Sequence, residues 1–213
     1  MPVNGAIALL IAYLLGSIPA AYIITRLRTG KDVRRLGGGN VGARNVFVEV
    51  GKGAGIAFGI FDVGKGAAAV AIAHWLLDAP QPFLLAAGLA VVAGHIWPIY
   101  LKFTGGNGLA TSLGVLSVLM TRELLIALAI TLVFLVVTRN PVLSLNLSLL
   151  SVPISGWFLK GNDWLFVIFP LLLILIMILN FVPVTRAAVV EAGGIGNYVA
   201  ELLRRDRTKK KEM

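Results

Sequence analysis

Long apolar stretches dominate the sequence and determine the solvent in which the chain can fold. The chain is 58% hydrophobic and 14% charged, whereas soluble domains carry about 25% charged residues. Seven apolar stretches separated by short polar segments lie at residues 3–25, 54–77, 83–103, 109–120, 123–138, 141–159 and 164–183. About 20 apolar residues in a helix cross a bilayer, and only helices or closed barrels satisfy backbone polar groups there. Because these stretches are too long for barrel strands, we expect an all-α, polytopic membrane protein with seven transmembrane helices, the fourth being short.

The basic residues are concentrated in two segments, and this distribution predicts the orientation. Of the 19 Lys and Arg residues, seven lie in residues 26–53 and seven in residues 184–213. Short loops rich in Lys and Arg stay on the cytoplasmic side of a membrane. We therefore expect an N-terminus outside, seven crossings, and a cytoplasmic C-terminus in the cell inner membrane. The expected organisation is a single transmembrane domain over residues 1–183 and a basic cytoplasmic tail over residues 184–213.

The basic tail does not indicate nucleic-acid binding, because no nucleic-acid-binding motif accompanies it. A solubilising tail or an anchor on anionic lipid is the expected role. The chain has no cysteine and two histidines, His74 and His95, which are too few for a metal site built from these residue types. No metal and no cofactor are expected.

Ionisable side chains interrupt two of the apolar stretches. Asp62 and Lys65 are three residues apart, so they share a helix face and can pair. Each such group costs about 2.5 to 3.5 kcal/mol at the centre of a membrane helix, and ionisable residues there are candidates for function. A structural pair that neutralises itself is the alternative. His95 is interpreted either as a packed residue bonded to a carbonyl or as part of a site.

Two glycine-rich segments lie in loops expected on the cytoplasmic side. Residues 37–53 read GGGNVGARNVFVEVGKG, and residues 105–108 read GGNG directly before the short fourth stretch. Successive glycine N–H groups can converge on one anion, and a helix that starts after such a loop adds its positive end. Both loops are predicted to bind phosphate, with a flexible turn as the alternative.

Together these motifs resemble one family, the bacterial acyl-phosphate:glycerol-3-phosphate acyltransferases. The resemblance covers about residues 10–150 and includes Gly16-Ser17-Ile18-Pro19 with Tyr22, Gly39-Asn40-Val41-Gly42-Ala43, Gly51-Lys52, Lys65-Gly66, Gly94-His95 with Pro98, Phe103, and Ala110-Thr111. It implies seven helices with the N-terminus outside. It also implies the metal-free transfer of a fatty acyl group from acyl phosphate to the 1-hydroxyl of glycerol 3-phosphate, which gives lysophosphatidate for phospholipid biosynthesis.

The resemblance also assigns candidate site residues on the cytoplasmic face. The catalytic candidates are Asn40, Asn45, Asp62, Lys65 and His95. The candidates for binding substrate or phosphate are Gly38, Gly39, Gly42, Arg44, Lys52, Gly105, Gly106, Asn107, Gly108, Thr111, Arg139, Ser144 and Ser148. Ser144 and Ser148 could equally join helices by hydrogen bonds. The expected partners are acyl phosphate, glycerol 3-phosphate and membrane lipid, and the oligomeric state is left open.

The chain departs from the family at several polar positions. Gly38 stands in place of a serine, Val48 in place of an arginine and Asn107 in place of a lysine, while residues 193–197 read GGIGN where the family has His-Arg-x-Asn-Ile. Arg44 is a candidate for a relocated cation. Each charge-assisted bond to phosphate contributes about 1.5 to 3 kcal/mol. Two alternatives therefore stay open: a non-catalytic or altered-specificity paralogue that binds a lipid or acyl phosphate, and a transporter of a small organic phosphate.

Overall fold

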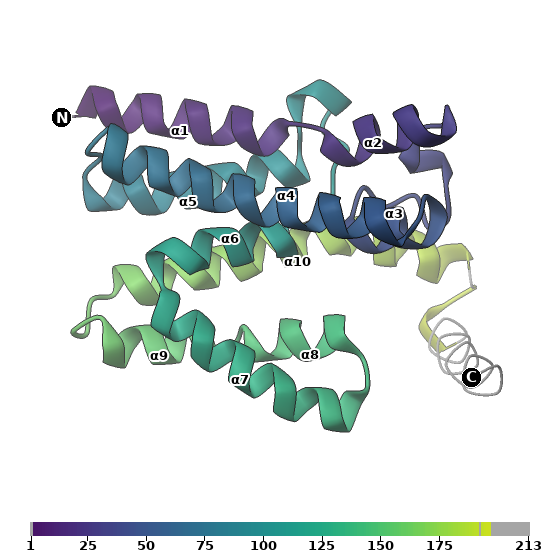
Figure 1. Cartoon of the computed structure of the whole chain (residues 1–213). Helices are drawn as coiled ribbons and strands as arrows, with labels where there is room; N and C mark the ends of the chain where they lie inside the picture. Colours follow the sequence, from purple (N-terminus) through teal and green to yellow (C-terminus); the bar gives the residue numbers. More distant parts are fainter. Residues whose placement is uncertain (1, 192, 197–213) are drawn as a thin grey trace. The chain divides into compact units, whose positions relative to one another are not determined.

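The computed structural model describes residues 2–191 and 193–196, which fold into helices joined by short turns (Figure 1). No strand is formed in these two ranges. The elements are α1 (Pro2–Ser17), α2 (Ala20–Thr29), η1 (Val33–Arg35), α3 (Ala43–Glu49), α4 (Lys52–Ala71), η2 (Ile72–Leu76), α5 (Gln81–Ile96), η3 (Ile99–Leu101), α6 (Leu109–Leu119), α7 (Thr121–Thr138), α8 (Pro141–Ser148), α9 (Ser151–Leu159) and α10 (Leu165–Glu191).

Six helical stretches of the described chain are long and apolar enough to cross a bilayer. They are Val3–Thr29, Lys52–Leu76, Gln81–Leu101, Thr121–Thr138, Pro141–Leu159 and Leu165–Val182. Helix α6 is an additional apolar helix of 11 residues. These helices coincide with the predicted stretches, including the short one, so the all-helical membrane fold is confirmed. The count of seven crossings and the orientation stay predictions.

Three of the predicted spans are broken, and the last is longer than expected. The stretch 83–103 forms α5 and η3, which are separated at Trp97 and Pro98. The stretch 3–25 forms α1 and α2, which are separated at Pro19 because proline lacks an N–H group and disrupts the helix before it. The stretch 141–159 forms α8 and α9, which are separated at residues 149–150. Helix α10 continues to Glu191, so residues 184–191, predicted as part of the tail, are helical.

The chain divides into two compact units, residues 1–177 and 178–213. The first unit contains α1 to α9 and the beginning of α10, and all the site residues discussed below lie in it. The predicted division between residues 183 and 184 stays a prediction. The described part of the second unit consists of the rest of α10 and residues 193–196.

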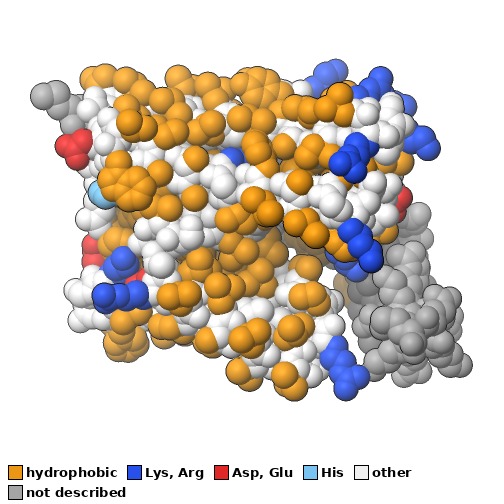
Figure 2. Space-filling model, viewed as in Figure 1, with side chains coloured by type: hydrophobic (Ala, Val, Ile, Leu, Met, Phe, Trp, Pro, Cys, Tyr) orange, Lys and Arg blue, Asp and Glu red, His pale blue; other side chains and the backbone are white. Residues whose placement is uncertain are grey.

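Two apolar clusters stabilise the first unit. The larger one includes Ala12, Val70, Val91, Val115 and Ala127. The smaller one includes Ala21, Val33, Val46, Phe58 and Leu101, and it supports the segments around α2 and α3. Many other apolar side chains point outward and cover much of the visible surface (Figure 2), as expected for a surface that contacts lipid.

Close approach of helices in the first unit depends on glycines that face a neighbouring backbone. A Cβ atom on Gly66 of α4 would overlap the carbonyl oxygen of Thr111, and one on Gly114 of α6 would overlap that of Val63. Gly16 of α1 faces α5 in the same way. In a bilayer, helices associate through such close packing because lipid is as apolar as the side chains.

Two neighbouring glycines of α4 provide a test of this packing. We expect Gly66→Ala to destabilise the protein by about 1 to 3 kcal/mol, because the added methyl group overpacks the α4–α6 contact. Gly64→Ala is the matched control, since nothing lies within 4 Å of a Cβ there, and it should leave stability unchanged or slightly raised. Thermal unfolding in detergent measures both variants, and equal midpoints would contradict the packing argument.

Candidate functional site

A buried ion cluster connects α4, α5 and the end of α1. The Lys65 Nζ atom lies 2.8 Å from Asp62 Oδ1 and 3.0 Å from His95 Nδ1, and it donates to the Gly16 carbonyl at 3.0 Å. The exposed fractions of Asp62, Lys65 and His95 are 1%, 6% and 7%. The predicted Asp62–Lys65 pair is confirmed, and His95 is its third member. His95 Nδ1 also lies 3.3 Å from Asp62 Oδ1, so the three side chains contact one another.

The two glycine-rich loops meet beside this cluster. The Gly105 and Gly106 N–H groups donate to the Ile96 and His95 carbonyls at 3.0 and 3.1 Å, which fastens the second loop to the end of α5. A Cβ atom on Gly106 would overlap His95 Nε2 and would lie 2.7 Å from the Val41 carbonyl of the first loop. The two predicted phosphate-binding loops are therefore neighbours.

The space beside the ion cluster is small. A cavity of about 10 Å³ borders Lys65 and His95 and is also lined by Gly16, Pro98 and Gly105. This volume is close to the minimum that holds one water molecule. The ion cluster therefore lies next to the second loop, whose Gly105 and Gly106 are bonded to the backbone at the end of α5.

The two asparagine side chains of the first loop differ in their hydrogen bonds to the described residues. Asn45 Nδ2 donates to the Leu36 and Val33 carbonyls at 3.0 and 3.3 Å, and Gly37, with φ of 52°, packs against the same side chain. Asn40 is half-buried, and its amide makes no hydrogen bond to any described residue. Asn45 therefore holds the first loop, and a role of Asn40 in binding a ligand stays a prediction.

The remaining polar candidates of the loops lie at the surface. The side chains of Arg44, Lys52 and Asn107 are exposed, and no described residue pairs with them. Gly38 is also exposed, with open space where a Cβ would stand. Gly108 has φ of 81° and immediately precedes α6, so the second loop leads directly into a helix N-terminus as predicted.

Three further candidates have mainly backbone roles. Gly39 has φ of 71° and packs near the Arg34 carbonyl, and Gly42 is the residue before α3. Thr111 is fully buried within α6, where its carbonyl contacts Gly66 and its hydroxyl has no described partner. Its burial separates Thr111 from the outer side of the loops.

Ser144, Ser148 and Arg139 are not brought to the two loops by the described contacts. The Ser144 hydroxyl lies 2.7 Å from the Thr138 hydroxyl, and the Ser148 hydroxyl lies 2.6 Å from the Thr131 hydroxyl. These contacts join α7 to α8, in agreement with the alternative that the serines connect helices. Arg139 is exposed and ends α7 with φ of 52°.

One ion pair near the site was not anticipated from the sequence. Asp32 caps η1 by accepting from the Arg34 N–H at 3.0 Å, and it pairs with the Arg34 guanidinium at 2.7 Å. The hydrogen bond from Arg34 is the main cause that lowers the pKa of Asp32 below its ordinary value, so the carboxyl group is ionised at neutral pH. Arg34 also donates to the Leu101 carbonyl at 3.4 Å, which links η1 to η3. The sequence signal that could have revealed this turn is Asp32 itself, because Asp is a preferred residue at the N-cap of a helix.

The fold and the site define an integral membrane protein with two glycine-rich loops in contact above a buried ion cluster. The sequence pattern of the glycerol-3-phosphate acyltransferase family matches residues 6–187. The chain therefore belongs to the glycerol-3-phosphate acyltransferase family.

Relatives and solved structures agree with this assignment. Glycerol-3-phosphate acyltransferase 1 of Dehalococcoides mccartyi is 41% identical, covering 79% of this chain and 84% of the relative. Glycerol-3-phosphate acyltransferase 2 of the same organism is 40% identical, covering 94% of each chain. The crystal structure of PlsY, an integral membrane glycerol 3-phosphate acyltransferase, in its glycerol 3-phosphate form has a TM-score of 0.75 and 29% identity, covering 85% of this chain and 90% of PlsY. PlsY has also been solved in a lysophosphatidic acid form.

The buried cluster predicts an asymmetric response to mutation. We expect Lys65→Met to destabilise the protein by about 3 to 5 kcal/mol, because it leaves a buried carboxylate without its cation. The double variant Asp62→Asn, Lys65→Met should recover part of this loss, since no buried charge is then unpaired. Lys52→Met, which removes an exposed lysine from the same helix, is the control. Unfolding in detergent measures all three, and a double variant that is less stable than Lys65→Met would contradict the ion-pair role.

Proposed function

We propose that this protein transfers a fatty acyl group from acyl phosphate to the 1-hydroxyl of glycerol 3-phosphate and so produces lysophosphatidate. The supporting observation is the contact between the two glycine-rich loops at Val41 and Gly106, in a chain that belongs to this acyltransferase family. The glycerol 3-phosphate form of the structurally similar PlsY also supports this substrate. Membership of the family makes the transporter alternative the weaker one.

The reaction requires orientation and charge stabilisation more than a protein nucleophile. The glycerol hydroxyl attacks the acyl carbon, the bond from that carbon to the phosphate oxygen breaks, and the hydroxyl proton leaves with the phosphate. Acyl phosphate is already activated, so holding two anions in line supplies most of the catalysis. The Asn40 amide and the N-terminus of α6 provide donors for this purpose, whereas the Gly39, Gly105 and Gly106 N–H groups already donate to protein carbonyls.

Arg44 supplies a cation close to the position from which the family arginine is missing. Arg44 and Val48 both lie on α3 and are four residues apart, so they occupy the same face of the helix. Both side chains are exposed. Arg44 therefore reaches the region that the arginine at position 48 would occupy, and it partly replaces that positive charge.

Asp62, Lys65, His95 and Asn45 act in this proposal as positioning residues. The first three are enclosed behind the loops, and the Asn45 amide is engaged by two carbonyls. None of them needs to touch a substrate to affect the reaction, because the loops that they hold carry the proposed donors.

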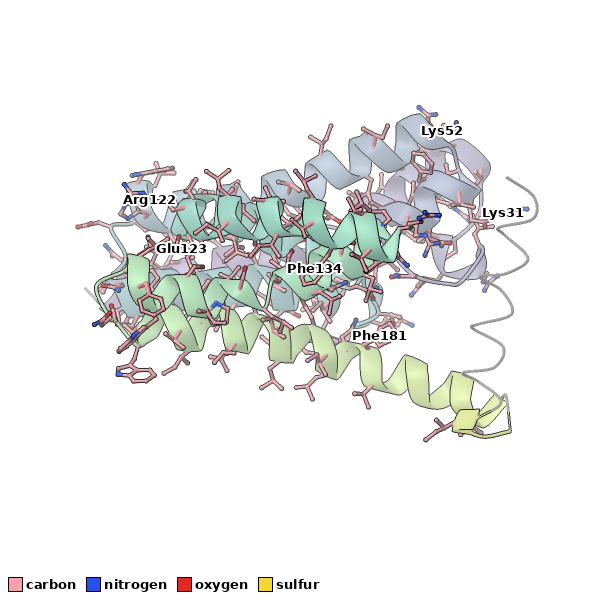
Figure 3. The ribbon with its side chains drawn as sticks, turned by 90° about the horizontal axis from the view of Figure 1, so that it is seen from below. Lys31, Lys52, Arg122, Glu123, Phe134 and Phe181 are labelled. Carbon is pink, nitrogen blue, oxygen red and sulfur yellow. The ribbon has the colours of Figure 1, made fainter. Side chains whose placement is uncertain are left out.

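The proposed orientation places the two loops in the cytoplasm, with seven helices and the N-terminus outside. Lys31 and Lys52 lie at one end of the first unit, and Arg122 lies at the other end (Figure 3). Most basic residues of the described loops are in residues 26–53, and this enrichment marks the cytoplasmic end.

Replacement of Asn40 tests the proposed site most directly. We expect Asn40→Ala to lower kcat/KM by about 100-fold, because a donor to the developing charge is lost. Asn146→Ala is the matched control, since Asn146 is exposed on α8 and bonds only to its own helix at Val142. Lysophosphatidate formed from acyl phosphate and glycerol 3-phosphate is the readout. Full activity in Asn40→Ala would refute this role, and no product from the parent would favour the non-catalytic paralogue.

Restoring the missing family side chains tests the phosphate-binding role of the loops. Gly38→Ser with Asn107→Lys should lower the KM for glycerol 3-phosphate or acyl phosphate by about 10-fold to 100-fold, because a hydroxyl and an ammonium group can each bond to phosphate. Position 38 has space for the added atoms. Gly38→Ala with Asn107→Gln is the control with neither group. Unchanged KM values for both substrates would place the phosphates elsewhere.

A further inference from the structure

A second basic region lies between α2 and η1, apart from the two glycine-rich loops. A pocket of about 550 Å³, which we call the α2 pocket, is lined by Tyr22, Arg26, Gly30, Lys31, Asp32, Arg35 and Leu36. Figure 2 shows basic side chains gathered at the end of the molecule where α2 and α3 lie. None of the residues lining the pocket belongs to the proposed acyl-transfer site.

The basic side chains that line the α2 pocket outnumber its one carboxylate. The exposed side chains of Lys31 and Arg35 form no ion pair or hydrogen bond with the described residues. The Arg26 guanidinium donates at 2.6 Å to a backbone carbonyl at the end of its own helix, which leaves its charge unpaired. The only carboxylate lining the pocket, Asp32, is paired with Arg34. Arg35 lies close enough to Asp32 to contribute to the lowered pKa of that carboxyl group. The pocket therefore combines three basic side chains with one carboxylate that is already paired with Arg34.

Exposed apolar side chains on α2, the helix that carries Tyr22 and Arg26 of the pocket, indicate the source of the anion. Ile23 and Leu27 of α2 are 44% and 82% exposed. Helix α2 forms the end of the apolar stretch that begins at Val3. Basic residues that follow the end of a span lie at the level of the lipid headgroups. A soluble anion would meet only the charges, whereas a lipid would meet both the charges and the apolar side chains.

We propose that the α2 pocket binds the phosphate group of an anionic membrane lipid, whose acyl chains lie along Ile23 and Leu27. Arg26, Lys31 and Arg35 supply charge-assisted hydrogen bonds to the phosphate oxygens. The Leu36 carbonyl at the edge of the pocket accepts from Asn45. A bound lipid therefore stabilises the segment that leads into the first glycine-rich loop.

The test measures lipid binding to the full-length protein in a neutral detergent, without acyl-transfer substrates. Native mass spectrometry compares short-chain phosphatidylglycerol, short-chain phosphatidylcholine and inorganic phosphate as probes. We expect the parent to bind phosphatidylglycerol in preference to phosphatidylcholine, and Lys31→Gln with Arg35→Gln to bind it about 30-fold more weakly. Arg28→Gln with Arg122→Gln removes the same charge from exposed positions outside the pocket and should change binding by less than about twofold.

Further measurements separate the remaining explanations. Lys31→Arg with Arg35→Lys keeps both charges and should bind phosphatidylglycerol like the parent, which excludes a folding defect as the cause of weaker binding. An equal loss in the two charge-removing variants would overturn the proposal in favour of a net-charge effect. Displacement of phosphatidylglycerol by an equal concentration of inorganic phosphate would overturn the lipid assignment in favour of a free anion. Because no acyl transfer is measured, these outcomes do not depend on the proposed function.

Discussion

The arrangement of the first unit depends on how the Lys65 ammonium group is satisfied inside the membrane. A buried cation is retained only where charged or hydrogen-bonding partners replace its water, and Lys65 obtains them from three helices: Asp62 of α4, His95 of α5 and the Gly16 carbonyl of α1. Gly16 lies in the last turn of α1, where carbonyl groups have no partner within the helix. One contact therefore satisfies both an ammonium group and the end of a helix. It also fixes the break before Pro19 relative to His95, and thus relative to the second loop.

In the candidate site, one set of residues determines the shape of the loop backbone, and another set determines the charge at its surface. The left-handed residues Gly37, Gly39 and Gly108 shape the two loops, and Asn45 with the ion cluster holds them from behind. The side chains that the family would place on the outer surface are the ones that differ, at Gly38, Val48 and Asn107. All three positions are exposed, so substitutions there change the charge presented to a ligand without disturbing the interior. The loop backbone therefore does not depend on the side chains at these three positions.

The sequence was sufficient to predict the helical membrane fold and the positions of the two glycine-rich loops. It was not sufficient to predict contacts between segments that are distant in the sequence. Hydropathy identifies the spans because burial in lipid is a local property of about 20 residues, and Asp62 and Lys65 are paired by helix geometry alone. Averaging over a span hides the breaks at Pro19 and at residues 149–150. His95 lies 30 residues from Lys65 in the sequence, so its partner depends on how α4 and α5 pack. The same limit applies to Ser144 and Ser148, whose hydroxyls were equally compatible with a phosphate and with a neighbouring helix until their partners were known.

The short helix η1 shows why the first loop depends on residues that do not belong to it. Asp32 caps its beginning, and the Asn45 amide donates to its Val33 carbonyl and to the Leu36 carbonyl directly after it. Arg34 extends from the same turn to Leu101 of η3, the element that precedes the second loop. The two loops are therefore connected twice, through η1 and η3 on one side and through the ion cluster on the other. Because both connections use buried or paired groups, the backbone of the loops is set before any ligand arrives. In the proposed function this is the condition under which fixed donors stabilise charge without reorganisation.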